Sequence, residues 1–284
     1  MPPSPRILLS IDYEPWFALV RRYDALGDSN QRRDLDAGFT SMALETILKK
    51  LGSSSVSFYL VGEIADWYPE VPQKILDAGH ELGLHCQIHR PLVSVKELKA
   101  DIQAAESWNA IYGIRGYRAP MVGIHEAAYP LLEKAGFLYS SSIYAPAGTL
   151  IRKGQIWELP VSTYRLFGGK QSVTAPRDFS LSLLAHGEIP YGSSFSIGLL
   201  GGFIFKILEQ ELLSGHSPVI ILHPYELVSP SVWPSRIVRD LVRNPLLWPF
   251  TWNKEDFLRR LLERFPISSL GAYLEEVLKD HHLN

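Results

Sequence analysis

Short apolar runs and helix-like segments alternate along most of the chain. Residues 7–11, 56–60 and 218–222 are runs of mainly branched and aromatic side chains with the length of buried strands. Between the first two runs, apolar residues recur at helical spacing over residues 42–51. Shorter strand-like runs lie at residues 81–84, 116–118, 137–139, 156–161 and 267–270. This alternation predicts a mostly parallel sheet covered by helices, either closed as a barrel or doubly wound.

Local signals mark the ends of the predicted helices. Ser94 and Glu97 form a capping box that starts a helix, and Gly113 is expected to end it. Further helices are predicted at residues 125–135, at residues 254–264 and at the C-terminus. These helices have the lengths needed to connect parallel strands.

Three segments interrupt the alternation. Residues 145–152 and 168–194 are rich in Gly, Ser and Pro and are predicted to be long loops, of the kind that shape a binding site. Residues 233–252 contain several Pro and Trp residues and are predicted to be irregular. No repeat and no domain boundary is evident, so we predict a single domain over residues 1–284.

The composition is that of a globular protein. Of its 284 residues, 46% are hydrophobic and 20% are charged, which excludes a disordered or collagen-like chain. The formal net charge of −2 gives no broad basic field for binding nucleic acid. The single cysteine, Cys86, cannot form an intramolecular disulfide, which fits a reducing compartment.

No segment predicts export or insertion into a membrane. Residues 1–6 lack the basic start and apolar core of a signal peptide. The most apolar stretch, residues 195–205, is far shorter than the ~20 residues of a spanning helix. It is predicted to be either a buried helix or a peripheral contact with a membrane surface. We therefore expect a cytoplasmic protein, with the inner membrane face as an alternative site of action.

Polar side chains follow the predicted strands at their carboxyl ends. They are Asp12 and Glu14, His85 and His89, Arg118, and His223. Because the carboxyl ends of parallel strands form one face of an α/β fold, these residues are expected to meet at one mouth. Two histidines and one carboxylate with an open position are the ligands expected of a catalytic zinc-like site.

Two of these groups have alternative interpretations. Asp12 follows an apolar strand, so its charge needs a cationic partner, which Arg118 or a metal could supply; it could also be a simple turn or cap residue. His223 is either a structural residue at a strand end or a general acid near neutral pH. The chain contains neither a phosphate-binding Gly-Lys-Ser/Thr loop nor a Gly-x-Ser-x-Gly elbow.

An ordered series of motifs resembles the polysaccharide deacetylases (NodB-homology, carbohydrate esterase family four), in the branch with Asp-x-Glu in the first motif. The matching segments are Ser10-Ile11-Asp12-Tyr13-Glu14, residues 78–85 followed by His89-Arg90, Tyr117-Arg118-Ala119-Pro120, residues 136–142, and Leu222-His223-Pro224-Tyr225-Glu226. Singly these motifs are short, but their common order and spacing are specific. The resemblance implies a deformed (β/α) barrel of about seven parallel strands and metal-dependent hydrolysis of N-acyl amides on sugars.

The resemblance also implies roles for individual residues. Asp12 becomes the general base, Arg118 the residue that orients it, and His223 the general acid. The implied ligands of a divalent metal, with zinc the first expectation, are Glu14, His85 and His89. The backbone N–H of Met121 falls where the family has part of its oxyanion hole. The aromatic residues near the motifs, which could be sugar platforms or core packing, are Trp16, Tyr144 and Tyr225.

Two positions depart from the family pattern. Tyr13 stands where a metal-binding aspartate follows the base, so Glu14 is expected to be the third ligand. Ser140 stands where the family has the aspartate that polarises the acid histidine. The absence of this aspartate is expected to lower the pKa of His223 and to slow protonation of the leaving group.

The expected substrate is an amino sugar with an acetyl or formyl group, in a soluble glycan or a lipid-linked precursor. Three alternatives remain open. One is a metal-independent amidohydrolase of the same fold that acts on a small cyclic amide. Another is a catalytically weak carbohydrate-binding relative. The third is a glycosidase that pairs Asp12 with Glu158 or Glu226. The sequence does not predict the oligomeric state.

Overall fold

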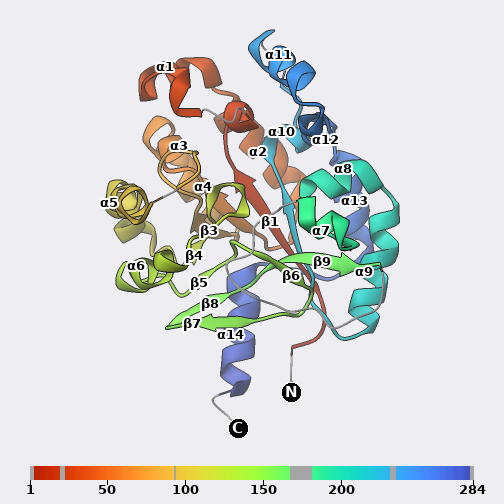
Figure 1. Cartoon of the computed structure of the whole chain (residues 1–284). Coiled ribbons are helices and arrows are strands. Elements are labelled where there is room, and N and C mark those ends of the chain that lie inside the picture. Colours follow the sequence, from red (N-terminus) through yellow and green to blue (C-terminus); the bar gives the residue numbers. More distant parts are fainter. Residues whose placement is uncertain (1–2, 20–22, 93, 167–180, 231–234, 282–284) are drawn as a thin grey trace.

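A curled parallel sheet forms the centre of the molecule (Figure 1). The computed structural model describes residues 3–19, 23–92, 94–166, 181–230 and 235–281. In spatial order the strands are β11 (Val219–Leu222), β1 (Ile7–Tyr13), β2 (Ser57–Leu60), β3 (Glu81–Leu84), β4 (Gly116–Tyr117), β5 (Tyr139–Ser140), β8 (Ile156–Glu158) and β7 (Ile151–Lys153). The seven strands from β11 to β8 run parallel, and β7 is antiparallel to β8. The predicted barrel is confirmed as an open half-barrel.

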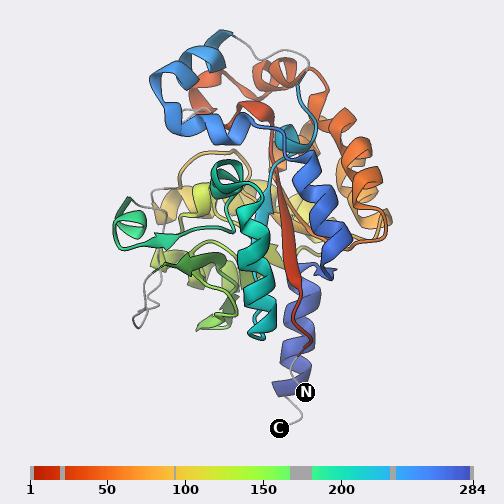
Figure 2. The ribbon, with the colours of Figure 1, turned by 90° about the vertical axis from the view of Figure 1, so that its right-hand side faces the viewer.

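Helices surround this sheet (Figures 1 and 2). They are α1 (Ser29–Asp36), α2 (Phe39–Leu51), α3 (Gly62–Trp67), α4 (Glu70–Asp77), α5 (Val95–Tyr112), α6 (Tyr129–Lys134), α7 (Leu181–Ala185), α8 (Ser194–Leu200), α9 (Phe203–Leu213), α10 (Pro224–Leu227), α11 (Ser235–Arg243), α12 (Trp248–Thr251), α13 (Glu255–Arg264) and α14 (Leu270–His281). The 3-10 turns in the described segments are η1 (Trp16–Leu19), η2 (Tyr23–Leu26), η3 (Pro120–Val122), η4 (Glu126–Ala128) and η5 (Pro245–Leu247). The termini lie at the end of the molecule opposite α1 and α11.

The predicted cap of α5 is confirmed. The Ser94 hydroxyl accepts a hydrogen bond from the backbone N–H of Glu97, and Gly113 ends the helix in the left-handed conformation at φ 60°. A residue with a side chain pays a steric penalty at such a position, which glycine avoids. This helix packs beside the loop that follows β3, and that loop carries two of the predicted site residues.

Several predictions at the far edge of the main sheet and beyond it were wrong. The strand predicted at residues 156–161 is divided between β8 and β9 (Val161–Arg165), which belong to different sheets. Pro160 separates the two, because proline lacks the N–H that a continuous strand would donate. The segment predicted as a loop at 145–152 contains parts of β6 (Tyr144–Pro146) and β7. The next predicted loop contains α7 and β10 (Glu188–Ile189), and its residues 168–180 lie outside the described chain.

A second sheet, ordered β10-β9-β6, closes the side of the half-barrel near β11. The region predicted to be irregular forms α11, η5 and α12, except that residues 233–234 are outside the described part. The short C-terminal strand β12 (Ile267–Ser268) extends the main sheet by pairing in parallel with the start of β1. Among the described residues, no helix has the length and apolarity needed to cross a membrane.

Side chains of β1 alternate between the two faces of the sheet. Ile7, Leu9 and Ile11 pack in the main apolar core with the covering helices. The other face is concave. The hydroxyl of Tyr59 on β2 donates to the hydroxyl of Tyr139 on β5 at 3.1 Å, across the two strands between them, and this short distance shows the curvature. Leu8 packs with these tyrosines. Ser10 and Asp12 follow Leu8 at the strand period, so β1 directs Asp12 into the concave side.

Helix α2 provides a test of this packing. Ile47 is fully buried in the main core, whereas Met42 on the same helix is 66% exposed. We expect Ile47→Ala to lower the free energy of unfolding by about 2–5 kcal/mol, since it leaves a cavity. The matched change Met42→Ala should stay within about 0.5 kcal/mol. Chemical denaturation measures both, and equal losses for the two variants would contradict this packing.

Candidate active site

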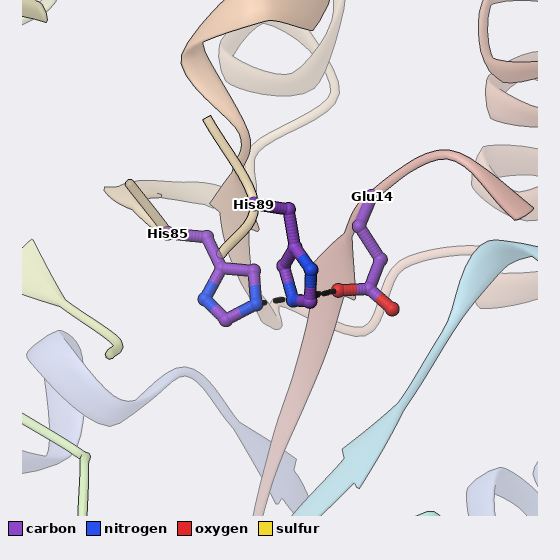
Figure 3. Close-up of side chains that lie close together, drawn as sticks. All are labelled: Glu14, His85 and His89. Atoms are coloured by element: carbon purple, nitrogen blue, oxygen red, sulfur yellow. Dashed lines mark ion pairs between the residues drawn. The ribbon is translucent and has the colours of Figure 1, made fainter. Parts of the chain in front are cut away.

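Glu14, His85 and His89 converge at the carboxyl ends of the strands (Figure 3). One ligand atom from each lies within 4.8 Å of the other two, and all three residues are buried. Glu14 Oε2 is 2.9 Å from His89 Nε2 and 3.4 Å from His85 Nε2. The structure therefore brings together the three residues that were expected to be metal ligands.

Hydrogen bonds orient two members of this group. His85 Nδ1 lies 3.0 Å from the carbonyl oxygen of Arg118. A carbonyl oxygen only accepts, so Nδ1 carries the proton and Nε2 is directed at the carboxylate. On the other side, the Tyr225 hydroxyl donates to Glu14 Oε1 at 2.8 Å. The orientation of His85 is the one that a metal-ligating histidine requires.

Burial alone raises the pKa of Glu14, but the charges of His89 and His223 and hydrogen bonds from His85 and His89 outweigh this effect. The pKa of Glu14 is held well below its usual range. A buried carboxylate that stays ionised needs positive charge close to it. Protonated imidazoles or a divalent cation both satisfy that need. The donor set of two imidazole nitrogens and one carboxylate oxygen fits a zinc-like cation.

The turn between the two histidines is held by Asp101, a residue that the sequence analysis missed. Its carboxylate, on the buried face of α5, accepts hydrogen bonds from the backbone N–H groups of Gln87 at 2.8 Å and Ile88 at 3.3 Å. Cys86 in this turn is buried and has a φ of 106°, a region in which side chains are strained. The only available sequence signal was an aspartate among the core positions of an amphipathic helix.

Asp12 and Arg118 form a second part of the site. Asp12 Oδ1 lies 3.7 Å from Arg118 NH1, and Asp12 Oδ2 lies 4.0 Å from His85 Nε2. Arg118 NH2 donates to the hydroxyls of Ser10 and Ser141, and its guanidinium lies over the Tyr59 ring. The cationic partner that Asp12 needs is thus in place. Within the described residues, Asp12 Oδ1 accepts no hydrogen bond, which leaves it available to a reactant.

His223 follows β11 and lies beside the same carboxylate. Its Nε2 is 3.8 Å from Glu14 Oε1, and its ring stacks on Tyr225 with an interplanar angle of 9°. Its Nδ1 is 3.1 Å from Glu226 Oε2. Burial alone lowers the pKa of His223, but the charges of Glu226, Glu14 and Asp12 outweigh it and raise the pKa to about 9.

The expected fall in the pKa of His223 was therefore wrong. Ser140 does lack a carboxylate, and its hydroxyl donates to Ser142 instead. The missing charge comes from Glu226, three residues after His223. Glu226 was predicted only as an alternative glycosidase carboxylate, although its spacing from His223 at the start of a helix is that of a capping box, which the structure contains.

Tyr13 points away from the candidate metal centre. Its hydroxyl donates to the carbonyl oxygen of Thr40, and its ring packs against Phe58 in the helix-covered core. This outward direction follows from strand alternation, which places Asp12 on the concave face. Glu14, and not the residue at position 13, therefore supplies the carboxylate next to the two histidines.

The three predicted aromatic platforms are all buried. The hydroxyl of Tyr225 supports Glu14 and its ring packs on His223, so its observed role is to position these groups. Trp16 packs edge-on against Phe17, and Tyr144 belongs to a small apolar cluster, so a sugar-stacking role for either stays a prediction. Met121 has an exposed side chain and a left-handed backbone at φ 58°.

Other predicted carboxylates are engaged elsewhere. Glu158 is fully buried and accepts hydrogen bonds from the Ser142 backbone N–H and the Tyr129 hydroxyl. Glu226 is paired with His223 and Lys254. Both carboxylates therefore have structural partners, and the glycosidase interpretation leaves the histidine pair without a role.

The Asp101 carboxylate makes a pH-dependent prediction for the metal-free protein. Burial raises the pKa of Asp101 to about 6, against 3.8 for an ordinary aspartate. A carboxyl group whose pKa is raised in the folded protein stabilises the fold at pH values below its unfolded pKa of 3.8. This stabilisation is lost as the pH rises through about 6. The free energy of unfolding of the wild type exceeds or falls short of that of Asp101→Asn by a difference that depends on pH. This difference, wild type minus variant, should fall by on the order of 2 kcal/mol between pH 4.5 and 7.5. Urea unfolding measures this difference, and a difference that rises with pH would contradict the assignment.

Comparisons with known proteins agree with this architecture. No family model matches the chain. Over 151 residues the chain is 27% identical to FGM2, a peptidoglycan deacetylase-like protein of Gibberella zeae; the match covers 51% of this chain and 44% of that protein. The chain thus spans less than half the length of this curated relative.

Two solved structures share the fold over nearly the whole chain. PuuE allantoinase superposes with a TM-score of 0.58 at 14% identity, covering 97% of this chain and 91% of the other. A protein of Mycobacterium smegmatis, provisionally assigned as a polysaccharide deacetylase, gives a TM-score of 0.51 at 18% identity, covering 93% and 95%. At these identities the likeness concerns the fold alone.

Proposed function

Since the chain shares the barrel and the ordered motifs of the polysaccharide deacetylases, we propose that it is a metal-dependent hydrolase that removes an acetyl or formyl group from an amino sugar. One observation carries the proposal. The ligand atoms of Glu14, His85 and His89 lie within 4.8 Å of one another, and Asp12 and His223 both contact this group. An acid–base pair beside a candidate metal centre is the arrangement that amide hydrolysis needs.

Glu14, His85 and His89 would hold the ion, with zinc as the first candidate among divalent metals. The chemistry that a divalent ion supplies when bound is polarisation of a carbonyl oxygen and acidification of water. The remaining chemistry falls to the side chains around it. Their positions suit one to act as general base, one as general acid and a backbone N–H as hydrogen-bond donor.

Asp12 would take the proton from the attacking water, since Oδ1 is free of hydrogen bonds within the described residues. Arg118, fully buried beside it with NH1 3.7 Å from Oδ1, would orient this carboxylate. His223 would donate a proton to the departing amine. The backbone N–H of Met121 would donate to the developing oxyanion, an interaction worth roughly 3–4 kcal/mol in other hydrolases.

Metal analysis and acyl release test this function together. Asp12→Asn should lower acetate or formate release from N-acyl glucosamine oligomers by about 10²–10⁴-fold, because it removes the general base. Its metal content should match the wild type, whereas Glu14→Gln should lose metal. The control Asp77→Asn changes an exposed carboxylate on α4 and should leave both quantities unchanged.

Two other outcomes would contradict the proposal. Full activity after removal of metal by chelation would favour the metal-independent amidohydrolase. Sugar binding without acyl release by the metal-loaded protein would favour a carbohydrate-binding relative.

We also propose that the substrate is a carbohydrate carried on a lipid and that the protein meets it at the inner membrane face. In the predicted contact at residues 195–205, Ile197 and Phe205 are buried, whereas Leu199 and Phe203 are exposed. A better surface lies on α11, η5 and α12, which stand beyond the carboxyl ends of the strands (Figure 2).

This surface, hereafter the α11–α12 surface, combines exposed apolar and basic residues. Val242 is 70% exposed and Leu246 is 58% exposed, while Trp248 is also exposed. Arg239 and Arg243, both exposed, lie one helical turn apart along the side of α11. Apolar and aromatic groups flanked by arginines are typical of helices that lie on anionic bilayers.

Vesicle sedimentation tests this contact. The protein should bind vesicles that contain phosphatidylglycerol and should bind phosphatidylcholine vesicles weakly. Changing Arg239 and Arg243 to Gln should weaken binding by about 30-fold, from about 1 kcal/mol for each arginine. The control Leu199→Ser with Phe203→Ser removes exposed apolar groups from α8 and α9 and should have little effect. Equal binding to phosphatidylglycerol-containing and phosphatidylcholine vesicles would contradict this contact.

A further inference from the structure

Glu226 is a fully buried carboxylate three residues after His223. It accepts hydrogen bonds from the backbone N–H of His223 at 2.8 Å and from Lys254 Nζ at 2.8 Å, and its Oε2 lies 3.1 Å from His223 Nδ1. Each of its two oxygens is therefore committed: Oε2 to the histidine and Oε1 to the lysine. A carboxylate held at both oxygens has one orientation.

Lys254 is the group that fixes Glu226. Its side chain is 3% exposed, and Nζ also donates to the carbonyl oxygens of Pro249 at 2.8 Å and Trp252 at 3.3 Å. All three ammonium protons are thus used. Burying an ammonium group is costly unless it is paired in this way. Lys254 immediately precedes α13, so the pair connects α10, α12 and α13 around the acid histidine.

The same contacts set the direction of the imidazole. Nδ1 faces Glu226, with the Ser194 hydroxyl 3.1 Å from the same nitrogen, and Tyr225 stacks on the ring. Nε2 is left facing the candidate metal centre, 3.8 Å from Glu14 Oε1. The Ser140 hydroxyl, at the position that the family resemblance assigns to a carboxylate, donates to Ser142, and within the described residues no hydrogen bond joins it to His223.

We propose that Glu226, fixed by Lys254, is the positioning residue for His223 in the protonation of the leaving amine. This inference rests on the proposed deacylation. As the C–N bond breaks, its electron pair goes to nitrogen, which takes the Nε2 proton of the imidazolium. The ring is left neutral, with its remaining proton on Nδ1 facing Glu226. Solvent then restores the Nε2 proton.

The experiment compares two leaving groups. An N-acetyl glucosamine oligomer releases an amine that must be protonated, whereas 4-nitrophenyl acetate releases a stable phenolate that needs no proton. Glu226→Gln keeps the shape of the side chain but removes its charge. Its kcat on the oligomer should fall by about 10²–10³-fold, with less than about a 5-fold loss on the ester and KM within about 2-fold on both.

Two further variants guard against a folding defect. Glu226→Asp withdraws the carboxylate by one methylene and should give a smaller loss, again confined to the oligomer. Lys254→Met removes the ammonium group that holds Glu226 and should also lower kcat selectively on the oligomer. The control Glu255→Gln changes an exposed neighbour of Lys254 and should behave as the wild type on both substrates. Circular dichroism checks that each variant is folded.

Equal losses on the two substrates would overturn the inference, since a merely structural role affects both. The absence of any loss in Glu226→Gln would overturn it as well. A metal-loaded wild type that hydrolyses the ester but never the oligomer would instead refute the proposed deacylation, so the two failures are distinguishable.

Discussion

The ionised carboxylate of Glu14, buried where the strands end, is the group on which the site depends. Removing such a charge from water is costly, and the structure offsets that cost with three imidazoles and one tyrosine hydroxyl. These donors come from the ends of β3 and β11, elements far apart in the sequence. The parallel sheet therefore serves the site directly, since it brings their carboxyl ends to one face.

The concave face of the half-barrel extends this arrangement inward. The Arg118 guanidinium lies over the Tyr59 ring and donates to Ser10. The Tyr59 hydroxyl donates to Tyr139, which donates to Glu81. A polar interior of this kind is stable only when its groups are paired, and most of these are. The exceptions within the described residues include Asp12 Oδ1 and Arg118 NH1, and these two atoms face each other at 3.7 Å, where the proposed chemistry occurs.

Most of the main sheet, though not its β7 edge, and the candidate ligands were predictable because both depend on local signals. Strand period, apolar runs and the Ser94 capping box placed β1, β2, β3, β11 and α5 nearly to the residue. The second sheet was not predictable, since β6, β9 and β10 are short and their pairing depends on long-range contacts. Asp101 and Lys254 were missed for a similar reason. Each is an ordinary charged residue in the sequence, and only the fold reveals what it contacts.

The two departures from the family pattern have related geometric explanations. In an extended chain, side chains two positions apart face the same side, so Glu14 returns to the side of Asp12 while Tyr13 packs outward. At the start of a helix, side chains three positions apart are neighbours, so Glu226 reaches the ring of His223. The local backbone thus decides how far along the chain a replacement carboxylate can lie. Tyr13 and Ser140 are therefore compatible with the proposed acid–base site, because Glu14 lies beside the two histidines and Glu226 lies beside His223.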